Sequence, residues 1–147
     1  MMRNAVAHLQ GSKIREVANA GLGRSDVLAF WFGESDEVTS QAVRDEAKAS
    51  LDRGETFYSH NLGLAELRQA IAGYTSALHG PVEMDRIVVT SSGVSGLMLA
   101  SQLLVDPDDE VVAVTPVWPN LTAQPEILGA QVVRLPLSVH NGVWSLD

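Results

Sequence analysis

The chain of 147 residues contains no cysteine, which excludes disulfide bonds and thiolate metal sites. Basic side chains are also scarce: ten lysines and arginines stand against eighteen acidic residues, for a net charge of −8. An acidic surface repels the phosphates of nucleic acids and the anionic heads of lipids. We therefore expect no nucleic acid partner. A small anion can still bind where local dipoles outweigh the net charge at contact distance.

Long apolar runs are missing too, since none approaches the roughly 20 residues that a membrane-spanning helix needs. The first ten residues lack the basic start and apolar core of a secretory signal. With no cysteine in the chain, these features predict a cytoplasmic protein without a membrane partner. The four histidines are scattered, with no carboxylate at ligand spacing, so we expect no metal site.

What the chain does contain is an alternation of two periodicities. Apolar side chains recur at helical spacing over residues 12–21, 40–54, 64–78, 97–104 and 123–128. Compact apolar runs typical of strands occupy residues 27–32, 87–89, 110–114 and 131–135, and Asn141-Gly142 indicates a hairpin. This order predicts an α/β fold in which helices flank a mostly parallel sheet.

One stretch organises the rest: the β-branched run Ile87–Val89, followed by Ser91-Ser92-Gly93 and an apolar helix. A strand that turns tightly into a helix directs backbone N–H groups and the positive end of the helix dipole at one spot, which suits a phosphate. The same turn could instead be a close connection without a ligand, and these alternatives are evenly balanced. The stretch contains neither GxxxxGK nor GxGxxG, which disfavours a nucleotide P-loop and a dinucleotide site.

A second loop, residues 115–120, should leave the same edge of a parallel sheet, where ligands of such folds bind. Trp118 in this loop is either an aromatic plug of the core or a flat face for an aromatic ligand ring. Asn120 either hydrogen-bonds a ring substituent or caps the following helix, and its position favours the cap. Tyr58, in an irregular polar segment, is either a half-buried surface tyrosine or a phosphate donor.

Taken in order, several segments resemble the amino-terminal half of the fold-type I, pyridoxal-phosphate-dependent aminotransferases (class I/II, aspartate aminotransferase-like). The combination is more specific than any one segment, and it covers nearly the whole chain. The matching segments are Ser12–Arg15, Gly33–Asp36, Tyr58–Arg68, Ile87–Gly93, Pro107–Val111, Pro116–Asn120 and Gly129–Val133.

The resemblance implies that pyridoxal 5'-phosphate is the cofactor and that an amino acid and a 2-oxo acid are the substrates. It implies that residues 1–45 form an amino-terminal arm and small-domain segment, and that residues 46–147 form the first half of the cofactor-binding large domain. It also implies a homodimer with shared sites.

Site roles follow from the same resemblance. Ser92, Gly93 and Val94 would hold the cofactor phosphate, mostly through backbone N–H groups. Trp118 would stack on the pyridine ring, with Asn120 a candidate for a hydrogen bond to the cofactor. The remaining two roles are those of Tyr58, which would reach the phosphate of a neighbouring subunit, and Gly33, which would lie near the substrate carboxylate.

The family's chemistry needs a Schiff-base lysine, which the resemblance places beyond the residues given. The chain's two lysines, Lys13 and Lys48, do not match the lysine of the motif, so no catalytic residue is assigned. We therefore expect a truncated aminotransferase that is inactive alone. A lyase or decarboxylase on the same fold, a non-catalytic phosphate-binding or dimerising α/β module, and a nucleotide-binding domain remain as alternatives.

Overall fold

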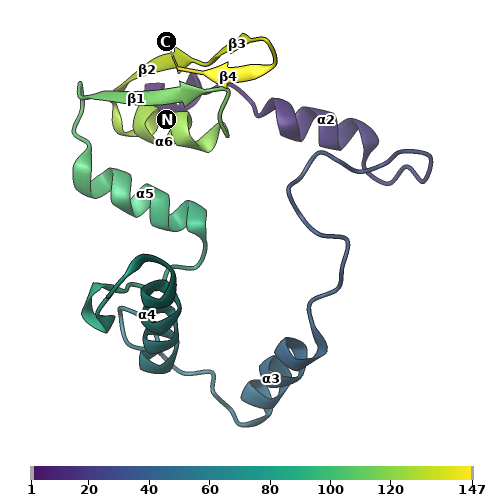
Figure 1. Cartoon of the computed structure of the whole chain (residues 1–147), viewed down its shortest axis with the longest axis vertical. Coiled ribbons are helices and arrows are strands. Elements are labelled where there is room, and N and C mark those ends of the chain that lie inside the picture. Colours follow the sequence, from purple (N-terminus) through teal and green to yellow (C-terminus); the bar gives the residue numbers. More distant parts are fainter. Residues whose placement is uncertain (1, 147) are drawn as a thin grey trace. The chain divides into compact units, whose positions relative to one another are not determined.

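The computed structural model describes residues 2–146, and their contacts divide the chain into two units (Figure 1). The first unit consists of residues 2–32 together with residues 91–146. The second consists of residues 33–90. Each unit is described by itself below, and the domain boundary between residues 45 and 46 stays a prediction.

The first unit is built on a pair of parallel strands, β1 (Glu110–Thr115) and β2 (Gln131–Pro136). The register runs from Glu110 opposite Gln131 to Thr115 opposite Pro136. Helix α6 (Asn120–Leu128) connects the two strands and packs against both. Helix α5 (Gly93–Leu104) packs against α6. These elements confirm the predicted α/β class with a parallel sheet.

Glycine and small residues make the strand–helix–strand connection compact. Gly129 ends α6 with φ of 101°, a left-handed conformation that favours glycine, and a Cβ there would lie 3.3 Å from the Pro107 side chain. Ala113 on β1 and Ala130 before β2 are buried. The chain therefore turns back onto the sheet immediately after the helix.

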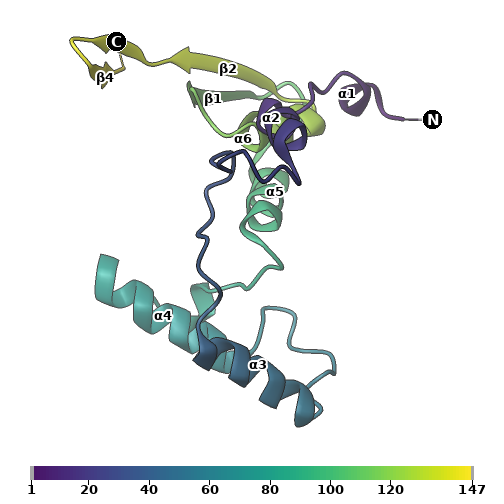
Figure 2. The same cartoon turned by 90° about the vertical axis from the view of Figure 1, so that its right-hand side faces the viewer.

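Shorter elements surround this connection. Helix α1 (Asn4–Ala7) lies against α6, where a guanidinium N–H of Arg3 donates to the Ile127 carbonyl at 3.0 Å. Helix α2 (Lys13–Gly21) begins at the predicted cap, with Ser12 Oγ accepting from the Arg15 N–H. The predicted hairpin forms as β3 (Ser138–His140) and β4 (Val143–Ser145), and Figure 2 shows it beyond the end of β2.

The second unit contains α3 (Gln41–Asp52), α4 (Ala65–His79) and the 3₁₀ turn η1 (Met84–Arg86). Its most buried polar side chain is Arg68 of α4, which is 7% exposed. Arg68 Nε donates to the Ile87 carbonyl at 2.9 Å, and a terminal N–H donates to the Met84 carbonyl at 2.8 Å. This guanidinium therefore fixes the segment after η1 against α4.

The turn before α4 holds the same segment from its other side. The Val89 N–H donates to the Leu62 carbonyl at 2.9 Å. Gly63 has φ of 102°, and a Cβ at this position would lie 2.6 Å from the Val89 side chain. Only glycine allows this close approach of the two segments.

Two predicted strands are wrong. Residues 27–32 and 87–89 are extended or bent but form no ladder in the described chain. A strand needs a neighbour for its N–H and C=O groups, and here those groups bond locally: the Phe30 N–H donates to the Leu28 carbonyl, and Val89 bonds to the turn at Leu62. Phe30 is 87% and Val88 56% exposed, so these apolar runs are neither paired nor buried in residues 2–146.

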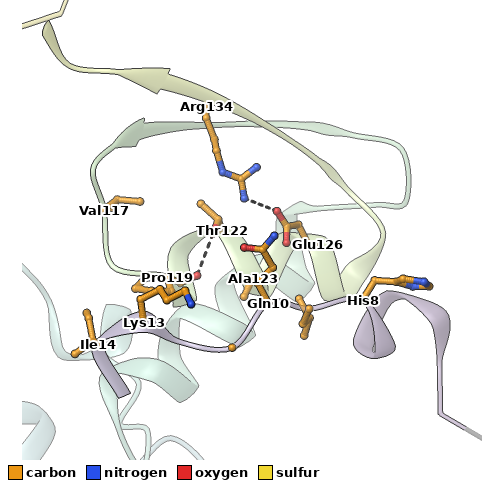
Figure 3. Close-up of a pocket in the computed structure, with 12 residues that line it drawn as sticks. His8, Gln10, Lys13, Ile14, Val117, Pro119, Thr122, Ala123, Glu126 and Arg134 are labelled. Carbon is orange, nitrogen blue, oxygen red and sulfur yellow. Dashed lines mark hydrogen bonds and ion pairs between the residues drawn. The ribbon is translucent and has the colours of Figure 1, made fainter. Parts of the chain in front are cut away.

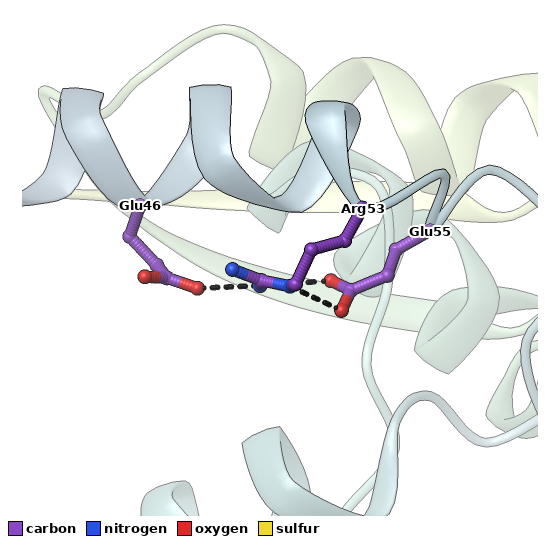
Figure 4. Close-up of polar contacts among 3 residues, drawn as sticks. All are labelled: Glu46, Arg53 and Glu55. Carbon is purple, nitrogen blue, oxygen red and sulfur yellow. Dashed lines mark hydrogen bonds and ion pairs between the residues drawn. The ribbon is translucent and has the colours of Figure 1, made fainter.

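A charged network closes the carboxyl end of α3. The Arg53 guanidinium donates to Glu46 at 2.7 Å and to both carboxylate oxygens of Glu55, at 2.7 and 3.1 Å (Figure 4). The hydrogen bonds from Arg53, with a further one from Ser50, lower the pKa of Glu55 to about 2. All three charged groups are solvent-accessible, so screening keeps the contribution to stability small.

The helices of residues 2–146 are all too short or too polar to cross a membrane.

We expect Arg68→Met to destabilise the second unit by about 2–3 kcal/mol, because the Ile87 and Met84 carbonyls lose hydrogen bonds from a charged donor. Amide hydrogen exchange in α4 and in residues 84–89 measures this loss locally. Arg86→Met, at an exposed arginine of the same segment, is the matched control and should change stability by less than about 0.5 kcal/mol. Equal effects of the two substitutions would contradict the assigned role of Arg68.

The pKa of Glu55 is a second measurable quantity. Because the folded chain lowers it from 4.5 to about 2, the stability that Glu55 contributes is present above pH 4.5 and is lost as the pH falls towards 2. A ¹³C carboxyl titration should show Glu55 returning to the ordinary range in Arg53→Gln. Arg44→Gln, on the same helix, should leave the pKa of Glu55 low. A low pKa that survives in Arg53→Gln would contradict the ion pair.

Candidate functional site

The amino terminus of α5 is the predicted phosphate turn. Ser92 is its N-cap, with extended backbone (φ −164°, ψ 163°) and with Oγ accepting from the Ser95 N–H at 3.2 Å. Helix geometry leaves the Gly93 and Val94 N–H groups without an intrahelical partner. The first turn of α5 carries no acidic side chain. Two backbone donors and the positive end of the helix dipole are therefore available to an anion.

The surroundings of this turn are open. Ser92, Gly93 and Val94 are all exposed, and a Cβ built on Gly93 would meet no atom within 4 Å. The Ser95 hydroxyl lies 3.0 Å from the hydroxyls of both Ser91 and Ser92. These hydroxyls form a polar rim next to the backbone donors, and a phosphate group can approach them without displacing a side chain.

Trp118 and Asn120 lie where β1 leads into α6, as the sequence predicts. Trp118 is 43% exposed, so it is no buried core plug, and its main-chain carbonyl accepts from the Leu121 N–H at 3.0 Å. An exposed flat face next to a helix start is available for stacking.

The capping role that the sequence favours for Asn120 is wrong. Asn120 is the first residue of α6, and Pro119 is the N-cap. The Pro119 carbonyl accepts from the Thr122 and Ala123 N–H groups and from the Thr122 hydroxyl, so the first turn is bonded without the Asn120 side chain. The Asn120 side chain therefore does not cap α6. It lines a cavity instead.

That cavity, of about 540 Å³, lies between α5 and α6. Val94 lines it from the phosphate turn and Asn120 from the start of α6. Across it, Gln124 Nε2 of α6 donates to the Val94 carbonyl at 3.1 Å. The structure thus brings the predicted phosphate turn and the helix that follows Trp118 into direct contact within one unit.

The other two predicted site residues, Gly33 and Tyr58, belong to the second unit. Both are exposed, and a Cβ on Gly33 would meet no atom within 4 Å. Tyr58 precedes the turn in which the Leu62 N–H donates to the His60 ring and the Gly63 N–H donates to the His60 carbonyl. Their roles towards substrate and cofactor stay predictions.

A separate cavity of about 630 Å³ lies between the amino-terminal arm and α6 (Figure 3). Glu126 and Arg134, paired at 2.7 Å, line one side of it, and Lys13 and Ile14 line another. Trp118 does not line it, although Val117 and Pro119 do. Trp118 does not line the cavity between α5 and α6 either, so the exposed indole borders neither of these two cavities.

Two buried polar residues, one in each unit, make structural contacts that the sequence did not predict. Gln124 and Arg68 are each 7% exposed and bond to main-chain carbonyls far away in the chain. Motif spacing cannot predict such contacts, because the acceptor is a main-chain carbonyl, which every residue carries. No group of three or more histidine or acidic side chains in residues 2–146 is placed to hold a metal ion.

Comparison with known proteins relates the sequence and the fold of this chain to one family. The family model described as Aminotransferase class I and II matches residues 26–147. An aspartate aminotransferase from Pyrococcus horikoshii is 31% identical over 134 residues, which cover 90% of this chain and 34% of that protein. An aspartate/prephenate aminotransferase from Thermus thermophilus is 32% identical over 80% of this chain and 31% of its own length. The chain thus spans about a third of the length of these relatives.

Solved structures agree with the sequence relatives. The structure of the Thermus thermophilus aspartate aminotransferase with maleate matches with a TM-score of 0.85 and 28% identity, over 92% of this chain and 37% of that one. An aminotransferase from Mycobacterium tuberculosis matches with a TM-score of 0.83 and 28% identity, over 92% and 36% of the respective chains.

Two substitutions at Ser92 separate helix capping from anion binding. Ser92→Ala removes the oxygen that accepts from the Ser95 N–H and should lower the free energy of unfolding by about 1 kcal/mol. Ser92→Asp keeps a capping oxygen and the stability, but its charge should weaken the binding of inorganic phosphate about fivefold. Urea unfolding and calorimetric titration with phosphate measure the two effects.

Ser101→Ala is the control on the same helix. The Ser101 hydroxyl donates to the Leu97 carbonyl in the helix interior, where alanine is at least as favourable as serine. This variant should change neither quantity. Unchanged phosphate binding in Ser92→Asp would show that the anion does not bind at the start of α5.

Proposed function

Because the chain belongs to the class I and II aminotransferases, we propose that the protein moves an amino group between an amino acid and a 2-oxo acid with pyridoxal 5'-phosphate. The observation that carries this proposal is the contact between α5 and α6. The exposed amino terminus of α5 suits a phosphate, and the exposed indole of Trp118, just before α6, suits a pyridine ring. The contact joins these two helices within one unit.

The residues present fit the two ends of such a cofactor. At one end, the Gly93 and Val94 N–H groups and the Ser92 hydroxyl would hold the phosphate, and no acidic side chain of the first turn opposes it. At the other end, Trp118 would stack on the ring and the Asn120 amide would bond a polar group of the cofactor. The net charge of −8 is no obstacle, because donors at contact distance outweigh distant charges that salt screens.

When bound, the cofactor supplies the electron sink for chemistry at the carbon that carries the amino group. The part of this chain is to bind and orient it. Fixed backbone donors need no reorganisation to hold an anion, so the phosphate end would anchor the cofactor and the indole face would set the tilt of the ring.

Neither lysine is assigned to catalysis. Lys13 pairs with Glu16 at 2.7 Å and Lys48 pairs with Asp45 at 3.4 Å, and both side chains are largely exposed. A lysine activated as a nucleophile is instead desolvated or placed beside another cation. The proposal therefore confines the role of these 147 residues to holding the cofactor and substrate.

Two further roles extend the proposal. Gly33, which leaves open space where a side chain would stand, would lie against the substrate carboxylate. Tyr58, whose side chain is fully exposed, would reach the phosphate of a second subunit in a homodimer. Both roles come from the family resemblance of the segments that contain them.

The experiment removes one backbone donor without disturbing the helix. Gly93→Pro deletes an N–H at the first position of α5, where proline is favoured and where the extended Ser92 accepts a following proline. Calorimetric titration should show pyridoxal 5'-phosphate binding about tenfold more weakly, because one hydrogen bond to a charged group is lost.

Gly93→Ala is the matched control, since it keeps the N–H and adds a Cβ in open space. It should bind the cofactor more tightly than Gly93→Pro does. Pyridoxal, which lacks the phosphate, should bind all three proteins equally weakly. An unmodified chain that binds pyridoxal 5'-phosphate no better than pyridoxal would overturn the proposal, and one that binds inorganic phosphate as tightly as the cofactor would favour a phosphate-binding module.

A further inference from the structure

We propose that Gln124 is a positioning residue that sets the spacing between the phosphate-binding turn of α5 and the indole of Trp118. This inference rests on the proposed function, because the two ends matter together only for a ligand that carries both a phosphate and a ring. It concerns a side chain that would touch neither end of that ligand.

The first observation is the burial of Gln124. Its side chain is 7% exposed although it belongs to a short helix on a chain with little buried surface. Burying an amide costs free energy unless it is hydrogen-bonded. Gln124 Nε2 meets that requirement by donating to the Val94 carbonyl, 30 residues earlier in the chain, at 3.1 Å.

The second observation is the identity of the acceptor. Val94 is the second residue of α5, and its own N–H is one of the two donors assigned to the phosphate. Its carbonyl has a second lone pair available beyond the bond within the helix. The Gln124 amide thus bonds to the carbonyl of Val94, the same residue whose N–H would contact the phosphate.

The third observation connects Gln124 to the indole. The Trp118 carbonyl accepts from the Leu121 N–H, and the Pro119 carbonyl accepts from the Ala123 N–H, so the indole-bearing loop is bonded to the first turn of α6. Gln124 lies directly after this turn on the same helix. A chain of hydrogen bonds therefore runs from the loop of Trp118 through α6 to the start of α5.

The rest of the α5–α6 contact has little ability to fix this spacing. Besides Val94, Asn120 and Gln124, the cavity between the helices is lined by small or unbranched side chains and by two branched aliphatic ones: Ser95, Ala123, Met98, Gln102, Leu99 and Ile127. A loosely filled interface leaves sliding of one helix along the other inexpensive. A directional hydrogen bond at its edge restricts that sliding.

The test uses Gln124→Met, which keeps the length and helix propensity of the side chain and removes the donor. We expect affinity for pyridoxal 5'-phosphate to fall about three- to tenfold, the range for one net hydrogen bond. Affinity for inorganic phosphate, which needs the α5 terminus alone, should not change. Gln102→Met, at an exposed position of the same cavity, should change neither affinity.

Amide hydrogen exchange provides a readout that needs no cofactor. In Gln124→Met, exchange should accelerate at the hydrogen-bonded amides near the start of α5, such as Gly96, and in the first turn of α6, and the amides of β1 and β2 should keep their protection. A loss of protection in the strands as well, or a parallel loss of affinity for both ligands, would make Gln124 a stability residue only and overturn the inference. Unchanged cofactor affinity and exchange would overturn it too.

The two proposals fail differently. If the unmodified chain shows no preference for pyridoxal 5'-phosphate over pyridoxal, the proposed function fails and this inference falls with it. If that preference is present and Gln124→Met leaves it intact, the proposed function stands and the positioning role alone is refuted.

Discussion

Parallel pairing of β1 with β2 is the constraint on which the candidate site depends. Two parallel neighbours need a crossover, so the chain must leave the carboxyl end of β1 and return along α6 before β2 begins. That crossover places the loop of Trp118 at the carboxyl edge of the sheet. Ligands of open α/β sheets bind outside this edge. The exposed indole of Trp118 therefore lies at the edge where the topology predicts a binding site.

In both units, directional hydrogen bonds contribute specificity that a large apolar core provides in other domains. The buried apolar side chains of residues 2–146 are four alanines and Pro125, and no large side chain among them is fully buried. Small side chains bury little area and give little shape specificity. The two buried polar side chains, Arg68 and Gln124, instead bond to specific main-chain carbonyls, each within its own unit. Among the buried side chains of residues 2–146, these two therefore make the directional tertiary contacts.

The sequence predicted much of this arrangement because local chemistry dictates it. The Ser12 cap, the glycine that ends α6 and the Asn141-Gly142 turn are local signals, and all three form as predicted. The strand prediction at residues 87–89 was wrong because pairing depends on a neighbour that no local pattern specifies. Asn120 was misassigned as a cap because the preceding proline already supplies the carbonyl that the first turn needs.

The contact between Gln124 and Val94 shows why the geometry of a site is harder to predict than its chemistry. Donors for a phosphate follow from a helix start, and a stacking face follows from an aromatic residue in a loop, so both can be inferred from short segments. Their separation depends on how two helices pack, and here a neutral amide and a backbone carbonyl fix it. Neither group titrates between pH 5 and 9, and a part-buried neutral contact is less sensitive to salt than an exposed ion pair such as that of Arg53. A spacing held in this way stays constant while the charge of a bound phosphate varies with pH.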